Sequence, residues 1–363
     1  HEGLIACQSA LQACRRNVRK YQRYTFVNIY QNYADILSGS GRQEEAFEYY
    51  CQSIIEFVIA GKSDTAERIF NQLSPNKKES IFNKFEKLED SLNANDWIYL
   101  ALFTDKHGQS QIALKMNLKA IALNPESSTA WNNLGLIQMN SGQLLEAEKS
   151  MINATGLDSL SITAWSNLGM LEMYLGHLTD AEKSLRKALF IDSTSYIAWN
   201  TLGLTQSDAG QFLEAEKSLR KAISIEPKFS TGWSNLGFVQ IQIEHWEDAY
   251  HSLHNAIVLD TAFANPRKHL GMVCFKTGRL NEGRQNFLKA LELKPDYSGA
   301  MLGMAYIAIA EKKYAEAFLW LEKAVINKAT LEQLMNDNEC KKIMDMPEWD
   351  KLLKKYFTDK VKD

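Results

Sequence analysis

Large and small residues recur along the chain with a period of 34 residues, from residue 94 to residue 331. Tryptophan keeps this phase at Trp97, Trp131, Trp165, Trp199 and Trp233. Leu-Gly pairs and two alanine columns follow the same period, and glycine recurs at the fifteenth position of most repeats. Small residues let two amphipathic helices approach closely while the large residues fill the gaps, and glycine permits the turn between them. The pattern predicts two helices in each of seven repeats.

These columns carry a resemblance to a known family. The chain is similar to the tetratricopeptide repeat family, whose 34-residue unit reads W-x2-L-G-x2-Y, then A-x3-F, then P. The octapeptide AEKSLRKA occurs at 181–188 and again at 215–222, and prolines close three of the repeats. The resemblance implies an all-α fold, a right-handed α-solenoid (superhelix) of tandem tetratricopeptide repeats with a C-terminal capping helix pair.

The repeats begin at residues 94, 128, 162, 196, 230, 264 and 298, and positions are counted from these starts. Three sections are expected. Residues 1–93 form an irregular helical section with one or two degenerate repeats, in which Pro75 precedes a polar helix over roughly 77–92. Residues 94–331 form the seven regular repeats, and residues 332–363, which contain Pro347, form capping helices that shield the last apolar face.

Composition narrows the possible partners. The 363 residues include 41 Lys plus Arg and 44 Asp plus Glu, a net charge of -3. This balance supplies no overall field for nucleic acid or an acidic membrane surface. No apolar run reaches the 18 residues of a membrane span, so membrane insertion is not expected. Five cysteines do not make a disulfide framework, which favours a reducing, cytoplasmic setting; His1 opens the sequence without a signal-like segment, and any removed targeting segment is invisible.

In this family the first helix of each repeat, helix A, lines the concave surface. Positions 2, 5, 6, 9, 12 and 13 share one face of that helix. Here this face is rich in amides and apolar residues and carries little charge. The expected peptide-binding residues are Asn132, Asn133, Leu136, Met139, Asn140, Asn167, Met170, Met173, Tyr174, Asn200, Leu204, Asn235 and Phe238.

Asparagine occupies position 6 at Asn133, Asn167 and Asn235, and Thr201 interrupts the column. The column resembles the asparagine ladder of the O-linked N-acetylglucosamine transferase repeat domain, which grips an extended peptide backbone. An amide offers both a donor and an acceptor to successive peptide groups, and nearby Met and Leu accept apolar side chains adaptably. The alternative is that the amides bond to neighbouring helices and that Met and Leu pack between repeats.

Two other columns bear on binding. Chaperone-binding members of the family use Lys at position 5 with Asn at position 9, but position 9 is never Asn here and Lys268 is the only base at position 5 in repeats two to six. Binding of an acidic chaperone C-terminus is therefore not expected. Position 11 carries a polar column, for which hydrogen bonds between helices are expected rather than a second ligand-facing ladder. Its members are Gln138, Glu172, Gln206 and Gln240.

Candidate chemistry is sparse. Gly61-Lys62-Ser63 lacks the preceding glycine of a phosphate-binding loop and is expected to be a turn. His251 and His254, with His245 nearby, are expected to be surface residues of the convex side, and no metal is assigned. A basic face at the N-terminus could meet RNA, although a solvated helix face is the favoured interpretation. That face consists of Arg15, Arg16, Arg19, Lys20 and Arg23, with Tyr21 and Tyr24 alongside.

The sequence therefore indicates a non-catalytic scaffold without a cofactor, which binds an extended peptide segment of a partner protein in its concave groove and helps to assemble a complex. One alternative is the substrate-recruiting repeat domain of a larger glycosyltransferase. A second is an RNA-associated scaffold that uses the basic N-terminal face, for which salt-dependent RNA binding would discriminate.

Overall fold

The structure is a computed structural model that describes residues 24–88 and 92–357. The expected basic N-terminal face lies outside these residues, except that the backbone of Tyr24 is described. Cys7 and Cys14 also lie outside them. Within the described ranges all regular structure is helical, and no strand occurs. The chain divides into two compact units, 1–176 and 177–363. This division falls inside the repeat array; the expected boundaries at 93/94 and 331/332 remain predictions.

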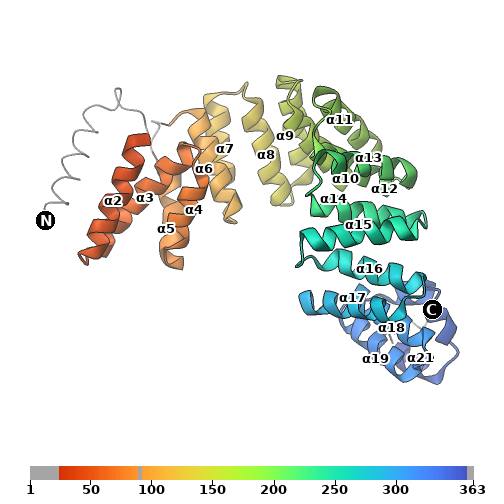
Figure 1. Cartoon of the computed structure of the whole chain (residues 1–363). Coiled ribbons are helices and arrows are strands. Elements are labelled where there is room, and N and C mark those ends of the chain that lie inside the picture. The colour runs from red at the N-terminus through yellow and green to blue at the C-terminus, as the bar shows by residue number, and fades with distance from the viewer. Residues whose placement is uncertain (1–23, 89–91, 358–363) are drawn as a thin grey trace. The chain divides into compact units, whose positions relative to one another are not determined.

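Unit 1 consists of helices that pack mainly against their neighbours in the chain, as Figure 1 shows for α2 and α3 or α8 and α9. Its helices are α2 (Tyr24–Gly39), α3 (Gln43–Ile59), α4 (Ser63–Asn71), α5 (Pro75–Glu86), α6 (Ala94–Lys106), α7 (Ser110–Leu123), α8 (Ser128–Asn140), α9 (Leu144–Leu157) and α10 (Ile162–Tyr174).

The N-terminal part of unit 1 has an aromatic core. The rings of Phe70, Phe82 and Phe103 pack at centroid distances of 5.4 and 5.5 Å, and His107 lies 4.3 Å from Phe70. The polar helix that was expected over 77–92 is instead α5, which starts at Pro75 and ends at Glu86. Proline suits the first turn because its missing N–H has no helical partner there. Phe85 is the last buried residue of α5, so the apolar face that holds the helix ends there.

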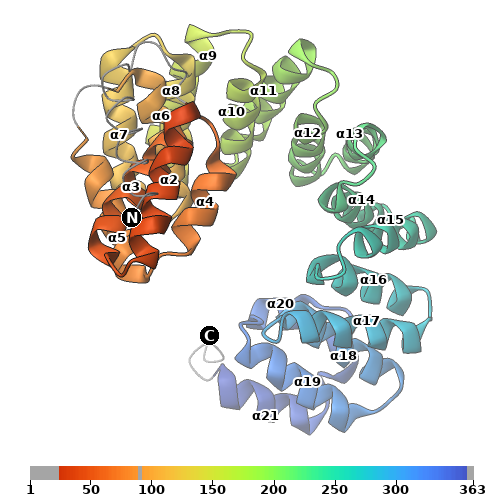
Figure 2. The same ribbon diagram turned by 60° about the vertical axis from the view of Figure 1, so that its left-hand side comes forward.

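Unit 2 contains the later repeats and the C-terminal cap (Figure 2). Its helices are α11 (Leu178–Ile191), α12 (Tyr196–Asp208), α13 (Phe212–Ile225), α14 (Ser230–Gln242), α15 (Trp246–Leu259), α16 (Ala264–Lys276), α17 (Leu280–Leu293), α18 (Ser298–Ala310), α19 (Tyr314–Ile326), α20 (Leu331–Asn336), the 3-10 helix η1 (Cys340–Ile343) and α21 (Pro347–Tyr356).

Glycine at position 8 brings the two helices of a repeat together. A Cβ added at Gly135 would lie 2.6 Å from Cγ of Met151, and one added at Gly237 would lie 2.6 Å from Cγ of Leu253. These distances are shorter than van der Waals contact, so no larger residue fits without movement. The predicted close approach of helix A to helix B is confirmed.

The turn between the two helices needs a left-handed backbone at position 15. Gly142 and Gly210 adopt φ of 77° and 73° there, which glycine does without steric cost. Glu244 and Lys312 occupy the same position in two repeats, with φ of 57° and 59°. These two repeats therefore carry local strain that the glycine repeats avoid.

Four of the tryptophans at position 4 connect their repeat to the turn that precedes it. The indole N–H of Trp131 donates to the carbonyl of Pro125 at 2.9 Å, and Trp165, Trp199 and Trp233 make the same bond to the carbonyl six residues earlier. These four rings are partly buried, whereas Trp97 is 1% exposed. Ring packing and a backbone hydrogen bond thus act together at the junction between repeats.

The predicted capping helices close the C-terminal end of unit 2. Leu334, Ile343 and Trp349 pack in one buried cluster with Leu321 of the last repeat. The hydroxyl of Tyr306 donates to Asp337 Oδ2 at 2.7 Å. In Figure 2, α18, α19 and α21 lie side by side, in agreement with their packing contacts. The last apolar helix pair is therefore covered, as a solenoid end requires.

Candidate functional site

Serine caps fix the start of three of the A helices. In α8, α10 and α12 the serine before the first residue accepts a hydrogen bond from a backbone N–H in the first turn; for Ser195 and Ala198 N the distance is 3.3 Å. Such a cap fixes where the helix begins. Because the helices start at the same repeat position, positions 2, 5, 6, 9, 12 and 13 occupy equivalent places on each helix A.

Amide pairs join successive A helices within each unit. In unit 1, Asn167 Nδ2 donates to Asn132 Oδ1 at 3.0 Å. In unit 2, Asn235 Nδ2 donates to Asn200 Oδ1 at 2.9 Å. Asn132 and Asn200 are buried, whereas the donors Asn167 and Asn235 are partly exposed. The asparagine at position 6 is therefore held by the asparagine at position 5 of the preceding repeat.

The other polar residues of the predicted face differ in their surroundings. Asn133 is 6% exposed, and its side chain has no hydrogen-bond partner among the described residues. Asn140 is exposed and donates to Asp105 Oδ2 at 2.7 Å. Thr201, which interrupts the asparagine column, donates to the carbonyl of Ile197 at 2.9 Å in its own helix. Part of the column therefore forms hydrogen bonds within the protein, as the alternative interpretation predicts.

The apolar residues of the face divide between packing and exposure. Leu136 and Met139 pack against a buried cluster that includes Leu168 and Leu171. Met170, Met173 and Leu204 are partly buried. Tyr174 is 64% exposed in unit 1, and Phe238 is 37% exposed in unit 2. In each unit an exposed aromatic side chain therefore lies on the same helix as the amide donor, Tyr174 on α10 and Phe238 on α14.

The polar column at position 11 bonds to helix B. The hydroxyls of Ser150, Ser218 and Ser252 donate at 2.7 Å to Oε1 of Gln138, Gln206 and Gln240. The two partners are always 12 residues apart, and the bonds in unit 2 are buried. The interpretation of this column as a set of hydrogen bonds between helices is confirmed for these three glutamines.

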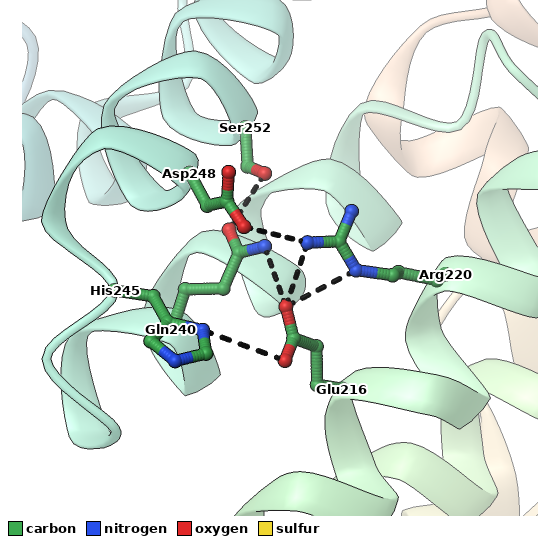
Figure 3. A network of polar contacts seen from close by, with 6 residues as sticks. All are labelled: Glu216, Arg220, Gln240, His245, Asp248 and Ser252. Carbon is green, nitrogen blue, oxygen red and sulfur yellow. Dashed lines mark hydrogen bonds and ion pairs between the residues drawn. The ribbon is translucent and has the colours of Figure 1, made fainter.

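One of these bonds extends into a larger polar network in unit 2 (Figure 3). Gln240 Nε2 donates to Glu216 Oε1 at 3.0 Å, which links α14 to α13. Arg220 Nη2 donates to Glu216 Oε1 and to Asp248 Oδ2, both at 2.8 Å. The network joins three consecutive helices, and a partly buried network of this kind fixes their register when its members are paired.

The same network contains metal-ligating residue types. One ligand atom each of Glu216, His245 and Asp248 lies within 4.8 Å of the others. However, both carboxylates already accept hydrogen bonds from Arg220, and His245 Nδ1 lies 3.7 Å from Glu216 Oε2. A cation would have to displace the guanidinium, so we assign these residues to the junction between repeats. His251 and His254 are exposed on α15, as expected for surface residues.

Helix α16 departs from the other A helices at positions 5 and 6, where it carries Lys268 and His269. Burial lowers the pKa of Lys268 to about 8. Burial, together with the charge of Lys268, lowers the pKa of His269 to about 3. The His269 ring stacks on Phe238 at a centroid distance of 5.3 Å. The sequence signal for this site is the replacement of asparagine by histidine at position 6, a change that periodicity alone does not mark as functional.

The buried thiols are not suited to nucleophilic chemistry. Cys51, Cys274 and Cys340 are free and buried. Burial raises the pKa of Cys51 and Cys274 to about 12 and also raises that of Cys340. A thiol is reactive as its thiolate, which these environments disfavour. Gly61 and Lys62 connect α3 to α4 with the expected turn, and Ser63 is the first residue of α4.

The described helices include none that combines the length and apolar character needed to cross a membrane.

No curated protein matches the chain. Solved structures do resemble it. The Cut9-Hcn1 hetero-tetramer of the APC/C matches with a TM-score of 0.58 and 12% identity, covering 88% of this chain and 76% of that chain.

Two further structures share the fold. A tetratricopeptide repeat protein from Parabacteroides merdae has a TM-score of 0.54 at 18% identity, covering 69% of this chain and 99% of that one. The pilF protein of Pseudomonas aeruginosa has a TM-score of 0.51 at 20% identity, covering 58% and 96%.

Family models described as tetratricopeptide repeat match residues 27–54, 117–149, 162–194, 196–229 and 270–331. Together these segments span more than half of the chain. The helix pairs, the glycine contacts between them and the indole bonds between repeats agree with these matches. The chain belongs to the tetratricopeptide repeat family.

Proposed function

We propose that this protein is a protein-interaction scaffold that binds an extended peptide segment of a partner on its helix A faces and thereby helps to assemble a multiprotein complex. Membership of the tetratricopeptide repeat family supports the scaffold role. The similar Cut9-Hcn1 structure is itself a hetero-tetramer, which supports the assembly role by analogy of fold. The proposal assigns no catalytic step and no cofactor to the chain.

The observation that carries the proposal is the unused hydrogen-bonding capacity of Asn167 and Asn235. Each uses one N–H to hold the preceding amide, and neither Oδ1 accepts a hydrogen bond from a described residue. Both side chains are partly exposed. An amide held in this way presents a fixed acceptor to a peptide N–H without losing rotamer freedom on binding. Tyr174 and Phe238 supply exposed aromatic surface on the same helices as the two amides.

The test separates binding from structure within one amide pair. Asn235→Ala removes the exposed amide and the bond to Asn200, whereas Asn200→Ala removes the same bond and leaves the Asn235 amide in place. A partner segment identified by affinity capture is synthesised with a fluorescent label and titrated against both variants. We expect Asn235→Ala to weaken binding about 2- to 10-fold, since one hydrogen bond contributes about 0.5 to 1.5 kcal/mol. Asn200→Ala should weaken it less.

Equal affinity of the two variants and the parent protein would refute a binding role for this amide. Melting curves of both variants provide the control, because both lose the same bond between repeats. The RNA-associated alternative rests on the basic residues at 15–23, which the structure does not describe. The glycosyltransferase alternative rests on the asparagine column, which here is interrupted at Thr201 and paired across repeats.

A further inference from the structure

Lys268 is a partly buried cation on the helix A face of unit 2. It occupies position 5 of its repeat, the place of Asn200 two repeats earlier. Its ammonium lies 5.8 Å from the centroid of the Tyr297 ring. Its stem lies close to Gly299, since a Cβ added to that glycine would be 3.7 Å from Lys268 Cδ. The next repeat therefore leaves room for the lysine at its second position.

No residue in the described part of the chain supplies this lysine with a counter-charge. Helix α16 contains no Asp or Glu. The titratable groups around Lys268 are His269 on its own helix, Tyr297 before α18 and Lys294, whose ammonium lies 5.0 Å from the same Tyr297 ring. From α14 the neighbour is Phe238, stacked on His269. Among the described residues no carboxylate forms an ion pair or hydrogen bond with Lys268.

A cation in this setting is unusual in a folded protein. Burial disfavours the charged form of a side chain unless a partner of opposite charge or a set of hydrogen bonds compensates. Burial is the cause that lowers the pKa of Lys268 to about 8, and no nearby carboxylate offsets it. His269 Nδ1 is also buried without a hydrogen-bond partner among the described residues. The site is therefore incomplete in the isolated chain, and an anion from outside would complete it.

We propose that Lys268 receives the side-chain carboxylate of an aspartate or glutamate within the peptide segment bound on the helix A face of unit 2. This inference rests on the proposed function, whose groove residue Phe238 contacts the site through His269. It names the chemistry by which this part of the groove selects its partner.

The neighbouring groups indicate a side chain with a single negative charge inside the segment. His269 stays neutral at pH 7 because its pKa is lowered to about 3, so the site offers one cation from these two residues. One ammonium balances the single charge of a carboxylate, whereas a phosphate group carries up to two negative charges at pH 7. Helix α16 packs against two other A helices, α14 of the preceding repeat and α18 of the following repeat. The helix A face therefore extends in both directions from Lys268. The bound segment can therefore continue past the lysine rather than end there.

Binding of a carboxylate has a consequence for protons. A nearby negative charge raises the pKa of an ammonium, so the bound state of Lys268 holds its proton more tightly than the free state. Near pH 8 about half of the free lysine is deprotonated, and binding should take up about half a proton per site. A lysine that only packs against Tyr297 would show no such uptake.

The experiment uses the full chain and two pools of decapeptides with amidated C-termini. Every position is randomised without Asp or Glu, except the centre, which is Glu in one pool and Gln in the other. The pools compete for the immobilised parent protein, for Lys268→Gln and for Lys221→Gln. Lys221 is exposed on the B helix α13, outside the helix A face, and its variant has the same net charge as Lys268→Gln.

We expect the parent and Lys221→Gln to retain the Glu pool at least about 5-fold over the Gln pool, and Lys268→Gln to retain both equally. The best Glu peptide is then titrated by calorimetry at pH 8 in two buffers of different ionisation enthalpy, where proton uptake should be seen with the parent and not with Lys268→Gln. Equal retention of both pools by the parent overturns the inference and leaves the proposed function standing. Retention of neither pool overturns both. A Glu preference that persists in Lys268→Gln overturns the assignment to this lysine.

A C-terminal carboxylate is distinguished by a third pool, in which the centre is Gln and the C-terminus is free. If the parent prefers this pool to the amidated Glu pool, the site receives a chain end and the proposal of an internal side chain is wrong.

Discussion

The side-chain amide of Asn235 donates a hydrogen bond to Oδ1 of Asn200 at 2.9 Å, across 35 residues of sequence. Asn167 makes the same bond to Asn132 at 3.0 Å in the other compact unit. The bond ties the helix A of one repeat to that of the next, and the donor keeps its own oxygen available. One residue thus contributes both to the cohesion of the solenoid and to its proposed binding face.

The amide pair should show thermodynamic coupling. Asn200→Ala leaves a donor without its acceptor, and Asn235→Ala leaves a buried acceptor without its donor, so each should lower the free energy of unfolding by about 1 to 3 kcal/mol. The double variant should lose less than the sum, by about 0.5 to 1.5 kcal/mol. Urea denaturation of the four proteins measures this. Additive losses would show that the bond contributes nothing beyond the two separate side chains.

Gly237 should not accept even a methyl group. A Cβ at this position would lie 2.6 Å from Cγ of Leu253 and 3.4 Å from the carbonyl oxygen of Ala249. Gly237→Ala is therefore expected to lower stability by about 1 to 3 kcal/mol through overpacking. Gly156→Ala is the control, because nothing lies within 4 Å of its added Cβ in α9 and alanine favours a helix. Denaturation midpoints should shift in opposite directions; a fall of both would contradict the packing argument.

Glu244 marks a turn that glycine would stabilise. Its φ of 57° lies in the left-handed region, where Gly142, Gly176 and Gly210 stand in the equivalent position of other repeats. Glu244→Gly should raise the free energy of unfolding by about 0.5 to 1 kcal/mol. The substitution relieves the strain of a side chain in this conformation, and the greater freedom of glycine in the unfolded chain offsets part of that gain. Glu244→Ala keeps the strain and should give no such gain. Thermal melts of the two variants would decide, and a gain in both would point to the loss of the charge instead.

Acid should weaken the fold through His269. Its folded pKa is lowered to about 3 from the ordinary 6.5 by burial, so the unfolded chain binds more protons between these values. The contribution of the neutral buried ring to the free energy of unfolding is fully present above pH 6.5. It is lost as the pH falls from about 6.5 towards 3. His107, whose pKa burial also lowers, acts in the same direction.

The measurement compares denaturant midpoints at pH 7.5 and pH 5. His269→Asn, which restores the residue found at position 6 in three other repeats, should lose less stability on acidification than the parent. His254→Asn changes an exposed histidine of α15 and serves as the control. An unchanged pH dependence in His269→Asn would mean that the ring is accessible to protons in the folded state.

Much of the fold could be predicted from the spacing of residues. The glycines at positions 8 and 15 predicted a close helix pair and a tight turn, and both are observed at Gly135 and Gly142. The glutamines at position 11 predicted hydrogen bonds between helices, which Ser150, Ser218 and Ser252 supply. The length of α5 was overestimated, because polarity alone does not show where its buried face ends.

The candidate site was less accessible to prediction. The period placed Asn167 and Asn235 on the binding face of helix A, but it could not show that each is held by an amide of the preceding repeat. That pairing depends on the rotation and separation of two A helices, which no local pattern specifies. For the same reason Leu136 and Met139, expected on the groove, are partly taken into the packing against Leu168.

The sequence by itself determined that this protein is a tandem array of helix pairs, because a 34-residue period with small residues at fixed positions has one packing solution that buries its apolar faces. The tertiary structure decided which polar groups remain free. Hydrogen bonds and ion pairs form between residues about 12 or 35 positions apart, across helices whose spacing the packing sets. Only once these partners are placed does Lys268 stand out as a partly buried cation that no described carboxylate pairs with, since a missing partner is a property of the surroundings and not of the residue.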